Sequence, residues 1–232
     1  MHPTAADWEG LLETQRLLQR HFPDLVLVGG TAAALYAHHR FSLDGDHVLA
    51  DLRNHFDEVL HKLEDMAGWQ TNRIRPPVLI LGRLSGIDTG IRQLRRQAPL
   101  ETTEIAGLRV PTRAEMLRIK AWLVVTRNAF RDYLDFCALA DGLTDEDVVQ
   151  ALRSLDQLYP QPTGEPVCRQ LAKQLAEPHP YDLTDPASIR TYKGIQAPWD
   201  DWEHVLAVAR HHAQTLFRYL LQEENDAASP PE

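Results

Sequence analysis

The segment 25-LVLVGGTAAALYAHHRFSLDGDHVLADL-52 determines how the rest of this chain can be interpreted. Residues 24–30 form a short apolar run that ends in Gly29 and Gly30, which predicts a buried strand. The alanine-rich stretch after it favours a helix with Thr31 as its N-cap. Glycines let backbone amides approach a ligand closely, and the start of a helix offers unpaired N–H groups. This turn therefore suits an anionic group such as a phosphate.

Two carboxylates follow at the start of a second predicted strand, residues 44–52. Asp44 and Asp46 are two residues apart, so on a strand they project to the same face. Like charges that close repel each other unless a cation lies between them, and Mg²⁺ prefers oxygen ligands of this kind. The alternative is a polar turn, because Asp commonly forms Asx turns. His38, His39 and His47 lie nearby in the sequence, but we expect them on the surface because Mg²⁺ prefers oxygen.

Length and composition are those of an ordinary globular chain. The 232 residues are 44% hydrophobic and 25% charged, which is enough for one large domain or two small ones. No run of 18 apolar residues occurs and the N-terminus does not resemble a signal peptide, so a cytoplasmic location without membrane contact is expected. Cys137 and Cys168 have no neighbouring Cys or His at ligand spacing, which predicts two buried thiols.

Charge is distributed unevenly along the chain. The net charge of −9 argues against non-specific binding of nucleic acid. Residues 71–131, however, hold 12 Lys or Arg against 4 Asp or Glu, which leaves 12 against 29 for the remainder. A basic middle segment suits an anionic ligand. The alternative is that its arginines only solvate one face of the protein.

The other elements follow from periodicity and from Gly and Pro. Helices are predicted over residues 5–20 and over 54–68, the second with Asn54 as its cap. Further strands are predicted over 69–75, 77–84, 86–94, 100–105 and 108–110. From residue 111 onward the pattern is helical almost to the end.

This order predicts an α+β protein, with a mixed sheet flanked by helices and then an all-helical part. We expect an α/β core with an N-terminal helix over residues 1–111. A helical domain that completes the cleft would span 112–225, and a disordered tail 226–232.

The helical part contains charged residues in apolar surroundings. Lys120 lies on the apolar face of its predicted helix, so its amine either reaches the surface or points at an anion. Asp132 and Asp135 are three residues apart on the next helix, near Arg127, which suits an intrahelical salt-bridge network.

The combined spacing resembles that of the polymerase-β-type nucleotidyltransferases of the AbiEii/AbiGii toxin group. The matching positions of the opening segment are Gly29, Gly30, Thr31, Ser42, Asp44 and Asp46. Downstream, a short strand and a helix carry the family's lysine, arginine and Arg-Asp-x-x-Asp pattern at Lys120, Arg127, Asp132 and Asp135. The resemblance covers about residues 24–141, and the later helices match only in general character.

The resemblance implies an enzyme, a toxin-like nucleotidyltransferase that uses a nucleoside triphosphate (NTP) with Mg²⁺ or Mn²⁺. Enzymes of this fold add a third aspartate on a later strand, and Asp88 is the candidate, although Thr89 and Gly90 depart from the apolar residues of the family pattern. The implied metal ligands are Asp44, Asp46 and Asp88, which with Lys120 are the catalytic residues. The implied nucleotide-binding residues are Gly29, Gly30, Thr31, Ser42, Lys120 and Arg127. Asp132 and Asp135 are supporting residues.

The resemblance also implies the partners. The acceptor would be an RNA 3′ end, such as that of a tRNA, or a protein hydroxyl, and a cognate antitoxin protein would bind the chain. Two alternatives stay open. One is a phosphotransferase that modifies a partner protein, and the other is a catalytically inactive binding module of a toxin–antitoxin pair.

Overall fold

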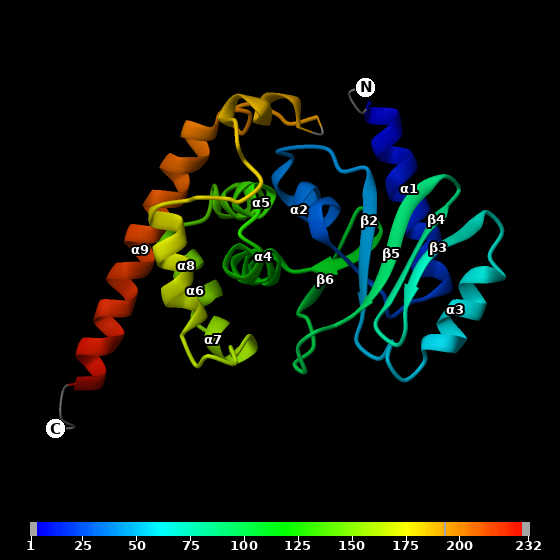
Figure 1. The fold of residues 1–232 in the computed structure, drawn as a ribbon, viewed down its shortest axis with the longest axis horizontal. Coiled ribbons are helices and arrows are strands. Elements are labelled where there is room, and N and C mark those ends of the chain that lie inside the picture. Colours follow the sequence, from blue (N-terminus) through cyan, green and yellow to red (C-terminus); the bar gives the residue numbers. More distant parts are fainter. Residues whose placement is uncertain (1–3, 193, 229–232) are drawn as a thin grey trace. The chain divides into compact units, whose positions relative to one another are not determined.

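The computed structural model of the chain describes residues 4–192 and 194–228. Contacts within the chain divide it into two compact units, Met1–Thr112 and Arg113–Glu232. The first unit contains a mixed sheet with helices, and the described part of the second is helical (Figure 1). The predicted α+β fold class is therefore confirmed. That the helical part completes an active-site cleft stays a prediction.

The elements of the first unit are α1 (Ala5–His21), β1 (Val26–Val28), α2 (Gly29–Ala37), β2 (Asp44–Leu49), α3 (Phe56–Glu64), β3 (Trp69–Arg75), β4 (Leu79–Leu84), β5 (Ile87–Gln93), β6 (Thr102–Ile105) and β7 (Leu108–Pro111). Those of the second unit are α4 (Arg113–Arg127), α5 (Phe130–Ala140), α6 (Asp145–Leu152), α7 (Leu155–Leu158), α8 (Val167–Ala176), the 3₁₀ helix η1 (Pro186–Thr191) and α9 (Trp202–Ala228).

Five strands of the first unit form one mixed sheet in the order β1-β2-β5-β4-β3. β2 and β5 run parallel, whereas the other neighbouring strands of this sheet are antiparallel. Parallel strands cannot be joined by a tight turn, so the chain crosses from β2 to β5 through α3, β3 and β4. β6 and β7 form a separate antiparallel pair.

Two hairpins of the first unit close through left-handed two-residue turns. In the β4–β5 turn, φ is 51° at Ser85 and 84° at Gly86. In the β6–β7 turn, φ is 53° at Ala106 and 72° at Gly107. Turns with positive φ at both central residues match the right-handed twist of the flanking strands. The first of these turns also fixes which residue of β4 lies opposite each residue of β5.

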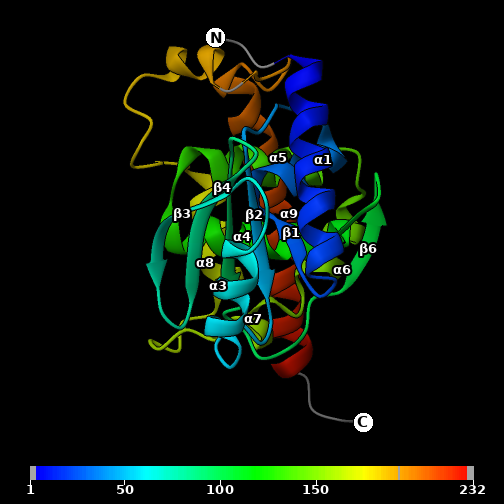
Figure 2. The ribbon, with the colours of Figure 1, turned by 90° about the vertical axis from the view of Figure 1, so that its right-hand side faces the viewer.

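The hydrophobic core of the first unit lies on one face of the five-stranded sheet. α1 and α3 cover this face, and Figure 2 views it with both helices in front of the strands. The buried cluster includes Leu18 and Leu63 from the helices and Trp69, Ile80, Leu84 and Ile91 from the strands. Full burial of a Leu or Ile side chain contributes about 1.5–3 kcal/mol. This packing leaves the opposite face, beside α2, available for polar side chains.

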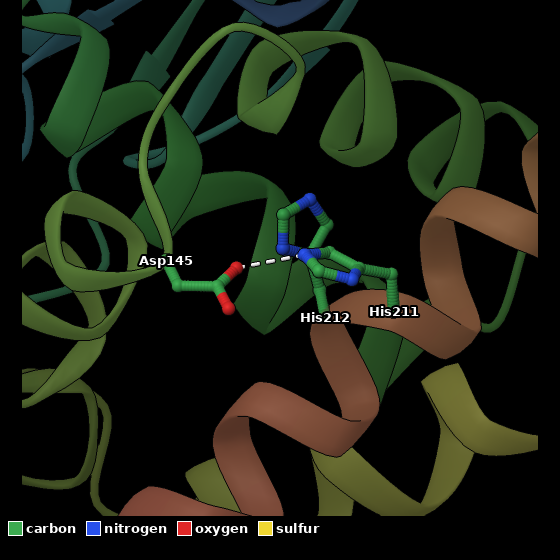
Figure 3. A group of neighbouring side chains, drawn as sticks. All are labelled: Asp145, His211 and His212. Atoms are coloured by element: carbon green, nitrogen blue, oxygen red, sulfur yellow. Dashed lines mark hydrogen bonds and ion pairs between the residues drawn. The ribbon is translucent and has the colours of Figure 1, made fainter.

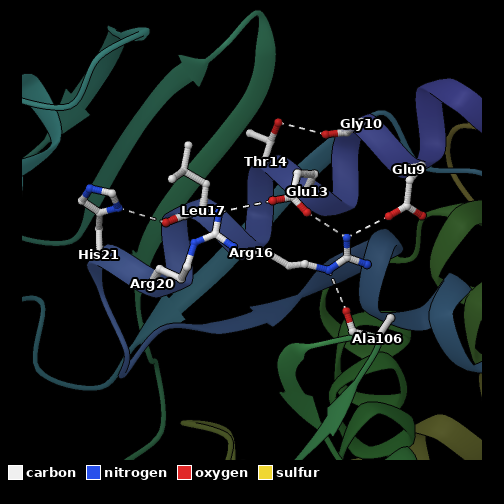
Figure 4. Close-up of polar contacts among 9 residues, drawn as sticks. All are labelled: Glu9, Gly10, Glu13, Thr14, Arg16, Leu17, Arg20, His21 and Ala106. Atoms are coloured by element: carbon white, nitrogen blue, oxygen red, sulfur yellow. Dashed lines mark hydrogen bonds and ion pairs between the residues drawn. The ribbon is translucent and has the colours of Figure 1, made fainter.

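Polar contacts attach the β6–β7 hairpin to α1 (Figure 4). Arg16 Nε donates to the carbonyl oxygen of Ala106 at 2.7 Å, and its Nη1 pairs with Glu9 Oε1 at 2.8 Å. Gln19 and Arg109 exchange two further bonds, of 2.9 and 2.8 Å, between the Gln19 amide and the Arg109 backbone. Hydrogen bonds from side chains of α1 to the backbone of the hairpin therefore fix it against the N-terminal helix.

The second unit is built around α5, which is buried from Asp132 to Ala140. Tyr133 of this helix packs edge-on against Trp202 at the start of α9. Cys137 and Cys168 are free and buried, as predicted. α9 continues to Ala228 and so includes residues 226–228 of the predicted tail, whose other residues lie outside the described part of the chain.

Two predicted helix caps are wrong. α2 begins at Gly29 with Val28 in the N-cap position, and the Thr31 hydroxyl instead bonds to the backbone of Asp44. α3 begins at Phe56 rather than after Asn54, whose side-chain amide bonds to Asp51. In both cases the polar side chain has a partner in the preceding turn or the neighbouring strand, which the local sequence does not reveal.

The expectation of surface histidines near Asp44 holds for His38 but is wrong for His39 and His47. His47 is on β2 but faces the core side of the sheet, since its neighbour Asp46 faces the other way. Its side chain is fully buried, and neither ring nitrogen has a hydrogen-bond partner within the described residues. Burial lowers the pKa of His47 to about 3. The folded protein therefore holds this imidazole neutral.

The buried His47 makes the stability of the protein depend on pH. An unfolded histidine takes up a proton near pH 6.5, whereas folded His47 does so only near pH 3, so stability falls as the pH drops between these values. The contribution is about 1.4 kcal/mol per pH unit for one proton. We expect His47→Leu to remove this contribution and to raise stability at pH 7.5 by about 1 kcal/mol, because a buried polar group without a partner is lost.

Urea unfolding of the full chain at pH 7.5 and at pH 5 measures this effect. His61→Gln, which replaces an exposed histidine of α3, is the matched control and should keep the wild-type pH dependence. An unchanged pH dependence in His47→Leu would contradict the assignment.

Candidate functional site

Three aspartates of the first unit project from one face of the sheet. β2 and β5 are in parallel register, with Asp44 opposite Asp88 and Asp46 opposite Gly90. Residues opposite each other share a face, and so do residues two apart on one strand. Asp44, Asp46 and Asp88 therefore lie on the face that α1 and α3 do not cover.

The start of α2 lies against this group of carboxylates. Gly29 has φ +73°, and a Cβ atom added to it would lie 3.3 Å from Asp46 Oδ2. Thr31 Oγ1 donates to the carbonyl oxygen of Asp44 at 2.6 Å, and Ser42 Oγ donates to Asp44 Oδ1 at 2.9 Å. Glycine at position 29 thus permits both the left-handed backbone and the close approach. The two hydroxyls fix the backbone and the carboxylate of Asp44.

Arginines pair with two of the three aspartates. Arg92 Nε lies 3.3 Å from Asp46 Oδ1, and Arg83 Nε lies 2.8 Å from Asp88 Oδ1. All four side chains are substantially exposed, with 38% exposure for Asp46 and 59% for Asp88. Exposed ion pairs contribute about 0–1 kcal/mol each, so a divalent cation can replace an arginine at little cost. Within the described residues the three carboxylates form no compact ligand group, so a metal ion needs these pairs to open.

The composition of this face fits a divalent metal. The donor atoms are carboxylate oxygens, which Mg²⁺ and Mn²⁺ prefer. A Cβ atom at Gly90 would lie 2.5 Å from Leu81 Cδ2 and 3.8 Å from Asp46 Oδ1, so glycine lets the Leu81 side chain pack over β5 beside Asp46. The Asp46 and Asp88 carboxylates themselves are accessible to solvent.

The predicted residues of the second unit form a buried charged cluster. Lys120 Nζ lies 2.7 Å from Asp135 Oδ2 and 3.4 Å from Asp132 Oδ1, and Arg127 Nε lies 3.5 Å from Asp132 Oδ2. Lys120 is 3% exposed and both aspartates are fully buried. Burial raises the pKa of Asp132, and the charge of Lys120 only partly opposes that effect.

These contacts correct the predicted intrahelical network. Asp132 and Asp135 on α5 pair with Lys120 and Arg127 on α4, so the ion pairs join two helices. The Lys120 amine does not reach the surface. The role of Lys120 and Arg127 as nucleotide ligands stays a prediction.

The structure thus groups the predicted site residues by unit. The first unit brings together Gly29, Gly30, Thr31, Ser42, Asp44, Asp46 and Asp88. The second unit brings together Lys120, Arg127, Asp132 and Asp135.

Three arginines beside the first group were not predicted. Arg83 and Arg92 were assigned only to a basic segment, whereas in the structure Arg83 pairs with Asp88 and Arg92 with Asp46. Arg40 is buried, and a Cβ atom at Gly30 would lie 2.2 Å from its Nη2 atom. Any side chain at position 30 would displace this guanidinium, which accounts for the second glycine of the pair.

Comparison with known proteins gives no match to a family model. The heme uptake protein MmpL11 of Mycobacterium tuberculosis is 36% identical over 114 residues, which are 46% of this chain and 12% of that protein. The mycolic acid-containing lipids exporter MmpL11 of Mycolicibacterium smegmatis is 33% identical over 150 residues, 58% of this chain and 15% of that protein. The chain therefore spans only a small part of the length of these relatives. None of the helices in the part of the chain that the structure describes combines the length and the hydrophobicity needed to span a bilayer.

Solved structures match over nearly the whole chain. A candidate nucleotidyltransferase from Helicobacter pylori superposes with a TM-score of 0.59 at 18% identity, covering 96% of this chain and 98% of that one. JHP933 from Helicobacter pylori gives 0.57 at 17% identity, with 96% of both chains covered. The antibiotic-resistance factor ANT(2'')-Ia gives 0.50 at 12% identity, with 66% of this chain and 94% of that one covered.

These likenesses establish the fold. The chain shares its fold with a candidate nucleotidyltransferase, which agrees with the kind of protein that the opening segment resembles. The likenesses do not single out the AbiEii/AbiGii group.

Loss of the Lys120 charge should destabilise the second unit strongly. Lys120→Met leaves two buried carboxylates without their shared cation, and removal of one partner from a buried ion pair costs about 3–5 kcal/mol. Urea unfolding measures this loss. Lys173→Met, at an exposed ion pair of α8, is the matched control and should change stability by less than about 1 kcal/mol. A loss below 1 kcal/mol in Lys120→Met would show that the buried pairs do not hold α4 to α5.

Proposed function

We propose that this chain transfers a nucleoside monophosphate from an NTP to an acceptor hydroxyl, with Mg²⁺ or Mn²⁺. The observation that carries the proposal is the register of β2 and β5, which sets Asp44 beside Asp88 and Asp46 beside Gly90. The superfamily fold supports the same reaction class. Three carboxylates on one exposed sheet face, next to a helix that starts with two glycines, suit a metal-bound triphosphate.

The first unit supplies the groups that bind the triphosphate. The start of α2 at Gly29 and Gly30 offers backbone N–H groups and the positive end of the helix dipole. Arg40 lies against the same backbone and adds a fixed positive charge. Thr31 and Ser42 hold Asp44 in place through their hydroxyls. Positioning of this kind does most of the work in phosphorus chemistry.

In the transfer step, the acceptor oxygen bonds to the α-phosphorus and the bond to the bridging oxygen of pyrophosphate breaks. A bound divalent ion would neutralise charge on the phosphate oxygens, with Asp44 and Asp46 as ligands. Asp88, from the adjacent strand, is a further ligand or the base that takes the hydroxyl proton. The family resemblance alone supports Lys120 and Arg127 as ligands of the outer phosphates, because Lys120 is 3% exposed and already pairs with Asp132 and Asp135.

The same face of the sheet suits a polyanionic acceptor. Arg83 lies opposite Asp88, and Arg92 is two residues beyond Gly90 on β5. Arg73 and Arg75 on β3 share this face through their register with β4. All four arginines are exposed. An RNA 3′ end, including that of a tRNA, would place its phosphates among these guanidinium groups, whereas a protein hydroxyl gains little from them.

The toxin-like role, the cognate antitoxin and the cytoplasmic location belong to the proposal as well. They are supported by the motif spacing that resembles the AbiEii/AbiGii group. If the chain is toxin-like, expression of the active protein should slow the growth of cells, and expression of the Asp44 and Asp46 variants described below should not.

Labelled nucleotides test the reaction class. The full chain is incubated with Mg²⁺, total RNA and each NTP labelled at either the α or the γ phosphate. Transfer of α label to RNA or protein supports the proposal. Transfer of γ label to protein would instead indicate a phosphotransferase. Nucleotide binding without transfer would indicate an inactive binding module.

Substitution of the aspartate pair should separate activity from stability. Asp44→Asn together with Asp46→Asn removes two negative ligands, so we expect transfer to fall by at least about 100-fold. The melting temperature should stay level or rise, because two like charges are removed from one sheet face. Asn at position 44 still accepts the bond from Ser42, so the backbone should keep its shape.

The matched control is Asp65→Asn, an exposed aspartate at the end of α3, which should keep full activity. Wild-type transfer activity in the double variant would rule out the metal assignment.

A further inference from the structure

A second cluster of ligand-type side chains lies in the helical unit and includes none of the residues assigned to nucleotide transfer. Asp145, at the start of α6, and His211 and His212, in the middle of α9, each offer one ligand atom, and these atoms lie within 4.8 Å of one another. Figure 3 shows the two imidazole rings beside the Asp145 carboxylate. The residues come from two helices that pack together.

The cluster contains one buried ring nitrogen without a hydrogen-bond partner among the described residues. His211 Nε2 lies 2.7 Å from Asp145 Oδ1. His212 is 4% exposed, and its Nδ1 atom is buried without a hydrogen-bond partner in the described part of the chain. A buried ring nitrogen without a partner is costly, and a metal ion is one of the few groups that can satisfy it.

The second carboxylate oxygen of Asp145, Oδ2, accepts a hydrogen bond from another side chain, as is usual for carboxylates that bind metals. Arg218 Nη2 donates to Asp145 Oδ2 at 3.2 Å and also to Thr215 Oγ1 at 3.2 Å. Hydrogen bonds of this kind orient a ligating carboxylate and leave its other oxygen for the metal. Oδ1, which now accepts from His211, is the oxygen that would bind.

From this geometry we infer that Asp145, His211 and His212 form a binding site for a divalent transition metal such as Zn²⁺. Two imidazole nitrogens and one carboxylate oxygen are a donor set that suits Zn²⁺ rather than Mg²⁺, which prefers oxygen alone. The fourth position is left for water. Bonds of about 2.0–2.2 Å to one ion would draw these ligand atoms closer together than the 4.8 Å that now contains them.

A bound ion would connect the start of α6 to the middle of α9. Asp145 is the first residue of α6, and α9 is the longest helix among the described residues. The site is therefore expected to stabilise the helical unit. It is independent of the proposed transfer reaction, whose metal ligands are all in the first unit.

Zinc titration of the full chain tests the inference. The protein is prepared without a histidine tag, stripped of metal with a chelator and titrated with Zn²⁺ in a calorimeter. We expect one tight site and an increase in melting temperature of about 5–10 °C at a free Zn²⁺ concentration 100-fold above Kd. Mg²⁺ at millimolar concentration should not compete. Absence of saturable binding would overturn the inference.

Substitutions then assign the site. His211 is exposed, and the amide of Gln can still donate a hydrogen bond to Asp145, so His211→Gln should fold normally. Because one metal ligand is lost, its Zn²⁺ affinity should fall by at least about 100-fold. Asp145→Asn should lose affinity similarly. His204→Gln, two turns earlier on α9, is the matched control and should bind as the wild type does. If His211→Gln and Asp145→Asn bind Zn²⁺ as tightly as the control, the cluster is only an ion-pair network.

Discussion

The parallel pairing of β2 with β5 is the constraint on which the candidate site depends. It brings Asp88 beside Asp44, although 44 positions separate them in sequence, and it places Gly90 beside Asp46. A register shift of one residue would turn Asp88 toward the core face and bring Thr89 into its place. The pairing is held by the apolar packing of β5 against α1 and α3 and by the Thr89 hydroxyl, which donates to the backbone of Gly45 at 2.7 Å.

Charged groups behave differently in the two units. In the first unit Asp46 and Asp88 pair with exposed arginines, so these pairs are weak and open to exchange with a cation or a phosphate. In the second unit Lys120 pairs with two buried aspartates, and loss of any partner leaves an uncompensated charge in the interior. The exposed pairs fit a site that must change its partners, whereas the buried pairs fit a role in holding α4 to α5.

Much of the fold could be predicted because local signals were strong. The apolar run before Gly29, the alanine-rich helix and the Gly86 turn each identify an element without tertiary information. The caps at Thr31 and Asn54 could not be predicted, since the real partners of these side chains lie on a neighbouring strand or in an adjacent turn. The burial of His47 was not predicted, although strand alternation turns it away from Asp46, because the surface prediction rested on the preference of Mg²⁺ for oxygen, which says nothing about burial.

Contacts between residues far apart in the sequence limited how much of the candidate site could be predicted. Asp88 was the candidate for the third carboxylate because of the family resemblance and its place on a predicted strand, but its register with Asp44 depends on a crossover through α3, β3 and β4. Lys120 was expected either to reach the surface or to point at an anion, which the resemblance implied to be the nucleotide phosphates. In the structure it contacts the carboxylates of Asp132 and Asp135. That pairing requires α4 and α5 to be antiparallel neighbours, which helical periodicity alone does not specify.

The most direct test of the account is a crystal structure of the full chain grown with Mn²⁺ and a non-hydrolysable NTP analogue, with anomalous scattering used to locate the metal. The account predicts a manganese peak bonded to the carboxylates of Asp44 and Asp46, the triphosphate at the start of α2, and an opened Arg92–Asp46 ion pair. A triphosphate bound elsewhere, with no manganese at these aspartates and both arginine pairs intact, would contradict it.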